Sequence, residues 1–123
     1  MIEHTILSNL LYNEEYVRKT VPYVKDEYFS EVEHKIVFNL LYNYFTKYNK
    51  LSTKESLKIS IDDKDGLSEE VYNNLNSIVD DLSIDKETDI DWLLDVTEKF
   101  CQEKAIYNAV KHSIVILDGK DKT

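Results

Sequence analysis

The sequence offers few side chains that could carry out chemistry. Its three histidines, His4, His34 and His112, are far apart, and none has a histidine or cysteine three or four residues further on, the helical spacing that zinc sites use. The one cysteine, Cys101, falls on the apolar side of the predicted last helix, which favours a core position over a nucleophilic role. Many carboxylates are present, but nothing selects a pair for acid–base work. We therefore predict no catalytic residue, no metal and no cofactor.

The two loop motifs that would bind phosphate or calcium are also missing. A phosphate-binding loop, G-x-x-x-x-G-K-[ST], would end at the Gly119–Lys120 pair, yet the chain has Ile114 and Asp121 where glycine and serine or threonine belong. A calcium loop turning at Gly66 would place Ile61 at the first ligand and Tyr72 where a bidentate glutamate belongs. ATP hydrolysis by this chain alone is therefore not expected.

Composition points to an all-α protein. The chain has 123 residues with only two glycines and one proline, which argues against a turn-rich β-sandwich or a glycine-built nucleotide fold. No apolar run approaches the ~18 residues that span a bilayer, and no basic-then-apolar segment opens the chain, so neither a membrane partner nor a signal peptide is expected. A single cysteine suits a reducing compartment, and we expect a cytoplasmic location.

The negative charge is concentrated in one segment. Of the net charge of −9, residues 62–98 alone carry −11, from thirteen acidic and two basic residues, whereas residues 1–50 are nearly neutral. Such a surface repels phosphate backbones, so binding of duplex DNA is not expected. The segment is interpreted either as a solvated face that maintains solubility or as a docking surface for a basic protein partner.

Helical periodicity runs through almost the whole chain. We predict capping boxes at Ser30 with Glu33 and at Ser52 with Glu55, an N-cap at Asp89, and an end of the last helix at Gly119. Residues 1–123 are predicted to form one helical domain, with a globule of about four short helices over residues 1–61 and an acidic helix pair over residues 68–117. The predicted helices span residues 6–13, 14–21, 30–48, 52–61, 68–82 and 90–117.

Aromatic and aliphatic residues of the first half define a predicted core. Tyrosines 42, 44 and 48 could stack single-stranded bases, but their helical spacing favours packing in and around a core. His34 is interpreted as a partly buried side chain satisfied by a backbone group. The residues predicted to be fully buried in the N-terminal globule are Phe29, Phe38, Leu41 and Phe45.

A length mismatch predicts an assembly surface. A helix over residues 68–82 spans about 21 Å and one over residues 90–117 about 42 Å, and the short connector predicts that they pack as antiparallel neighbours. The shorter helix would then leave the second half of the longer one uncovered. Its apolar positions there, Tyr107, Val110, Ile114 and Leu117, are predicted to mediate two-fold self-association.

The first half of the chain also resembles a known family. Glu3, followed by the pairs Ile6-Leu7 and Leu10-Leu11, precedes the run VPYVKDEYF, which ends at Phe29. His34 and the Val37-Phe38 pair come next. This pattern resembles the N-terminal domain of DnaB-type replicative helicases, in the form found in T-even-like phages, and the resemblance extends over about residues 3–117.

The resemblance implies assembly and docking without catalysis. In the family this domain builds the collar of a hexameric ring through helix-hairpin contacts and receives the primase and, in phages, the helicase loader; the ATPase motor is a separate domain. We expect this chain to be such a module, located in the cytoplasm of the host cell. The alternative is a small acidic protein that mimics DNA and inhibits a nucleic-acid enzyme, which should carry acidic residues along its whole length.

Overall fold

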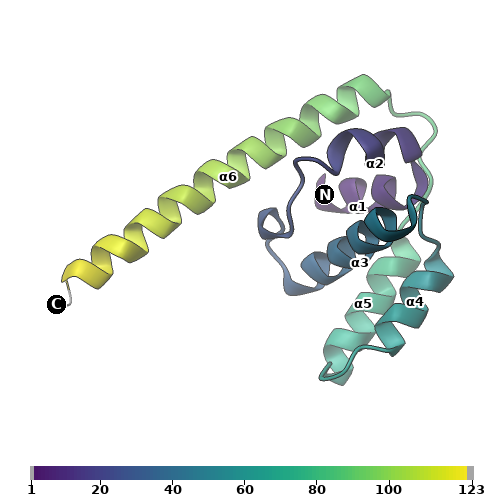
Figure 1. Cartoon of the computed structure of the whole chain (residues 1–123), viewed down its shortest axis with the longest axis horizontal. Coiled ribbons are helices and arrows are strands. Elements are labelled where there is room, and N and C mark those ends of the chain that lie inside the picture. Colours follow the sequence, from purple (N-terminus) through teal and green to yellow (C-terminus); the bar gives the residue numbers. More distant parts are fainter. Residues whose placement is uncertain (1, 122–123) are drawn as a thin grey trace.

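A computed structural model describes residues 2–121, and these contain helices and no β-strand. The predicted all-α class is confirmed. Helices α1 to α5 gather into a globule, and α6 projects far beyond it (Figure 1). The elements are α1 (Ile2–Tyr12), α2 (Glu14–Thr20), the 3₁₀ turn η1 (Asp26–Tyr28), α3 (Val32–Tyr48), α4 (Lys54–Asp62), α5 (Glu69–Asp81) and α6 (Ile90–Asp121).

Helix starts follow the expected chemistry at some positions and depart from it at others. Asp89 caps α6 as predicted, because its carboxylate accepts the Trp92 N–H at 3.1 Å. The second predicted capping box lies one residue further on: Thr53 and Ser56 form it, whereas Ser52 is buried.

The first predicted capping box is wrong. Helix α3 begins after Glu31 and has no side-chain cap, so Ser30 and Glu33 do not pair. The reason is tertiary: the Ser30 N–H donates to the Glu3 carboxylate of α1 at 3.0 Å, which holds this segment outside the helix.

Gly119 does not end the last helix. Helix α6 continues through Asp121, giving 32 residues and a length of about 48 Å. A Cβ added at Gly119 would meet no neighbouring atom, so nothing packs against the helix at this point. A glycine weakens a helix but does not by itself terminate one.

One hydrophobic core joins all the helices of the described chain, and an aromatic cluster lies where η1, α3 and α6 meet. Phe29 and Phe38 are buried with their ring centroids 5.2 Å apart, and Phe100 of α6 closes the cluster at 6.2 Å from Phe29. Leu41 and Phe45 are buried on the same face of α3. Burial of each such side chain stabilises the fold by about 1.5–3 kcal/mol.

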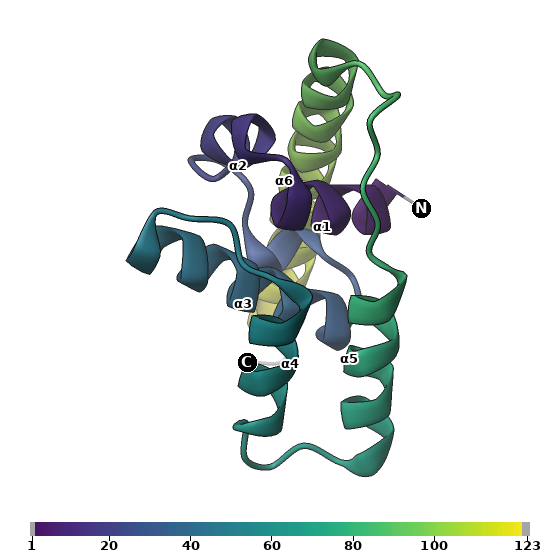
Figure 2. The same ribbon diagram turned by 90° about the vertical axis from the view of Figure 1, so that its right-hand side faces the viewer.

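The predicted antiparallel pairing of the last two helices is wrong. Helix α5 packs against α3 and α4, and Figure 2 shows α4 and α5 side by side. Asp80 of α5 fastens this hairpin, since its carboxylate lies 2.6 Å from the Lys58 ammonium and its carbonyl accepts the Lys54 ammonium at 2.7 Å. Helix α6 packs instead on α1, α2 and η1.

The connector between α5 and α6 explains this separation. Leu82 leaves α5 in an extended conformation and is buried, and the Ser83 N–H donates to the Ser8 hydroxyl of α1 at 3.3 Å. A few extended residues cover about 3.3 Å each, which carries the chain across the globule to the start of α6 (Figure 2). The connector therefore does not turn back as a tight hairpin would.

Candidate protein interface

The second half of α6 carries apolar side chains that remain largely exposed in the described chain. Tyr107, Val110, Ile114 and Leu117, the four residues predicted as an interface and called here the α6 seam, are 61%, 55%, 53% and 58% exposed. Figure 1 shows this part of α6 extending away from the globule. Contiguous apolar surface of this kind is typical of a site for protein contact.

Sequence reasoning missed three further exposed residues on the same half-helix. Ile106, Val115 and Ile116 are also exposed, so apolar surface extends beyond the single stripe of the seam. The sequence did contain a signal, because residues 114–117 are four consecutive apolar residues. A helix that buries only one face does not need apolar residues at four consecutive positions.

The motif residues Glu3 and His34 come together in the globule rather than at a catalytic site. One Glu3 oxygen accepts the Ser30 N–H, and the other lies 3.4 Å from Nδ1 of His34. The expected backbone partner is absent, because among residues 2–121 Nδ1 of His34 is buried without a hydrogen-bond partner and has the Glu3 carboxylate beside it. This contact ties α1 to the start of α3, which is a structural role.

Cys101 occupies the core position predicted for it. Its side chain is buried, and burial raises the pKa of the thiol to about 11, with a smaller contribution from the nearby Glu98 carboxylate. A thiol with so high a pKa is a poor nucleophile at neutral pH.

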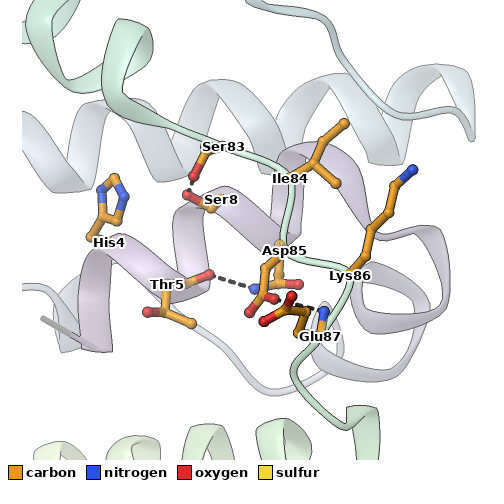
Figure 3. A pocket seen from close by; sticks show the side chains of 9 residues that line it. His4, Thr5, Ser8, Ser83, Ile84, Asp85, Lys86 and Glu87 are labelled. Carbon is orange, nitrogen blue, oxygen red and sulfur yellow. Dashed lines mark hydrogen bonds between the residues drawn. The ribbon is translucent and has the colours of Figure 1, made fainter.

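An open pocket of about 680 Å³ lies between α1 and the connector to α6 (Figure 3). His4 and Ser8 line one side, and residues 83–87 line the other. Asp85 is occupied within its own turn: it accepts the Thr88 hydroxyl and the N–H groups of Glu87 and Thr88, and these bonds lower the pKa of its carboxyl. Within residues 2–121, no three potential ligands gather to hold a metal ion here or elsewhere.

Comparison with known proteins identifies the family. Residues 1–90 match the family described as the DnaB-like helicase N terminal domain. The chain belongs to this family. The DnaB-like replicative helicase of Enterobacteria phage T4 is 29% identical over 111 residues, which cover 90% of this chain and 23% of the T4 protein. The chain thus spans about a quarter of the length of this relative.

The DnaB-like family match ends at the start of α6. It covers the globule and the connector, with the Glu3, Phe29 and His34 positions inside it. The similarity to the T4 helicase covers more than 90 residues and so reaches into α6. No helix among the described residues of this DnaB-like domain is both long and apolar enough to cross a membrane.

Proposed function

We propose that this chain is a non-catalytic assembly and docking domain of a phage-type replicative DNA helicase. Its role would be to contribute to the collar of a helicase ring and to receive the primase and the helicase loader in the cytoplasm of the host cell. The observation that carries the proposal is the exposed α6 seam on a domain of the DnaB-like N-terminal family.

The seam itself suggests how two copies would meet. Two antiparallel α6 helices related by a two-fold axis would place Tyr107 opposite Leu117 and Val110 opposite Ile114. Each contact then occurs twice, which is the defining property of a two-fold interface. Apolar side chains that are more than half exposed in the single chain would be removed from water.

Sedimentation velocity over a concentration series tests self-association. The wild type should shift from monomer to dimer or a larger species as concentration rises, whereas Ile114→Asp should remain monomeric because a carboxylate would be buried in the contact. Ile59→Asp is the matched control, since Ile59 is 55% exposed but lies on α4, far from the seam. A wild type that stays monomeric throughout, or equal association by Ile114→Asp, would contradict the proposed interface.

The proposed role also excludes two activities of the chain alone. The sequence has no phosphate-binding loop, and its net charge of −9 opposes contact with a phosphate backbone. We expect neither ATP hydrolysis nor binding of duplex DNA at physiological salt. The DNA-mimic alternative is less well supported, because the acidic residues are confined to one segment and Asp80 within it is held by Lys54 and Lys58.

A further inference from the structure

Three lysines line a partly open cavity where α6 leaves the globule. The cavity has a volume of about 250 Å³ and lies between η1, the first turns of α3 and the middle of α6. Lys35 comes from α3, and Lys104 and Lys111 come from α6; we call this site the lysine pocket. Its remaining lining residues are Glu27, Tyr28, Phe29, Ser30, Tyr107 and Asn108.

The pocket lysines have no carboxylate partner among the described residues. The ion pairs in residues 2–121 involve other basic side chains, although the sequence holds 24 acidic residues. Lys35 and Lys104 are partly buried as whole residues, whereas Lys111 is exposed. Glu27 is the one carboxylate in the pocket lining, and its ion-pair partner is Lys25, at 4.0 Å. Like charges that line one pocket repel each other, and an anion bound among the lysines would offset that repulsion.

The walls of the pocket are already held in place. The Asn108 side-chain amide donates to the Glu27 carbonyl at 3.0 Å, which joins α6 to η1. The Lys104 ammonium lies 5.9 Å from the Phe100 ring centroid and 5.8 Å from that of Tyr107, so cation–π contacts orient it. A preformed site of this kind binds without a large ordering cost.

We propose that the lysine pocket binds the carboxylates of an acidic segment of a partner protein, a partner class that rests on the docking role proposed above. Tyr107 lines the pocket and also begins the α6 seam, so one surface offers cations at one end and apolar side chains along its length. An amphipathic helix with acidic residues at one end complements both features. Such a helix would compete with a second copy for the α6 seam, so it would bind the single chain rather than the self-associated form.

Charge also argues that the occupant is a peptide rather than a nucleic acid. A phosphate backbone is a long array of negative charge, and the chain carries −9 overall and −11 over residues 62–98. A short acidic segment contacts the pocket locally, and charges more than about 8 Å away are largely screened at physiological salt. A short acidic segment is therefore attracted by the pocket lysines without being repelled by the acidic residues elsewhere on the chain.

Fluorescence anisotropy with two designed peptides tests the proposal. One labelled peptide carries leucines along one helical face and glutamates at one end, and the matched peptide has glutamine in place of every glutamate. At physiological salt, the full chain should bind the glutamate peptide about tenfold more tightly, because charge-assisted hydrogen bonds form only with the carboxylates. Lys104→Gln and Lys35→Gln should each reduce this preference, whereas Lys50→Gln, an exposed lysine outside the pocket, should retain it.

Several outcomes would overturn the inference. Equal affinity of the wild type for the two peptides, or an unchanged preference in both pocket variants, means that the lysines do not bind carboxylates. Displacement of the glutamate peptide by a single-stranded oligonucleotide means that the pocket binds phosphate. Loss of self-association in Lys104→Gln, with the helical circular dichroism retained, means that a second copy occupies the pocket. Failure of the proposed assembly role is distinguishable, because the wild type would then sediment as a monomer while its glutamate preference persisted.

Discussion

The two halves of α6 have similar apolar spacing but opposite surroundings. In the first half, Leu93, Phe100 and Cys101 are 1%, 9% and 5% exposed and pack against the globule. In the second half, Tyr107 and Ile114 are 61% and 53% exposed (Figure 1). The apolar period of a helix therefore tells which residues share a face, but not whether the protein's own core or another molecule covers that face.

Because of this difference, we expect the first half of α6 to contribute to the stability of the fold and the second half to contribute to association. Truncating a side chain in the globule or in the first half of α6 removes packing and creates a cavity, whereas truncating one in the second half removes atoms that already lie in water. The following experiments test this division between stability and association, and they are ordered from the largest expected effect to the smallest.

Phe38→Ala should have the largest effect. Phe38 is 3% exposed, and its ring packs against Phe29 and, at 5.7 Å between centroids, against Tyr42. The substitution should cost about 3–5 kcal/mol of unfolding free energy, measured by chemical denaturation. Val32→Ala, at a 61% exposed position on the same helix, is the control and should change little. An unchanged melting temperature for Phe38→Ala would place the core elsewhere.

Cys101 should be protected from thiol reagents in the native state. Burial raises its pKa from 9.0 to about 11, which reduces the thiolate fraction at neutral pH about a hundredfold. Labelling of the folded chain should therefore be at least that much slower than labelling in denaturant, as followed by absorbance of the released thiolate. Equal rates in the two states would show that the first half of α6 is not held against the globule.

Tyr16→Phe should have a moderate effect on the junction between α2 and α6. The Thr97 hydroxyl donates its hydrogen to the Leu93 carbonyl at 2.7 Å. The Tyr16 hydroxyl lies 2.7 Å from the Thr97 oxygen, and because the Thr97 hydrogen is already used, Tyr16 is the donor in this second bond. Burial also raises the pKa of Tyr16. Loss of this one buried hydrogen bond should cost about 1 kcal/mol of unfolding free energy.

The control for this substitution is Tyr48→Phe. Tyr48 is 53% exposed, so removing its hydroxyl should leave the packing and the unfolding free energy nearly unchanged. Equal destabilisation by the two variants would mean that the Tyr16–Thr97 hydrogen bond contributes nothing specific to the docking of α6.

Ile114→Ala should have the smallest effect. Because Ile114 is 53% exposed and projects from the uncovered half of α6, its truncation should change the unfolding free energy of the monomer by less than about 0.5 kcal/mol. The measurement is chemical denaturation at a protein concentration below the onset of association. A cost comparable with that of Phe38→Ala would mean that the seam packs inside the chain after all.

Much of the local structure followed from the sequence. The helical period located the six α-helices of residues 2–121, and Asp89 marked one helix start, because a short polar side chain before a helix can accept a free backbone N–H. Ser68, where the helix over residues 68–82 is predicted to begin, is the N-cap of α5. The family resemblance also followed from residue types, and the family match over residues 1–90 includes Glu3, Phe29 and His34. Helix positions and helix caps depend on residues that are close in the chain, and the family resemblance depends on a residue pattern shared with other proteins.

Tertiary structure decided which helices meet. The period of α5 is equally compatible with packing on α6 or on α3 and α4, and the second occurs because the extended connector carries α6 to the other side of the globule. Likewise, the sequence does not predict that Lys35 and Lys104 line the same pocket, because they lie on different helices that meet only in the folded chain. Contacts between distant residues depend on the path of the whole chain, and that path is set by the packing of the core rather than by any local pattern.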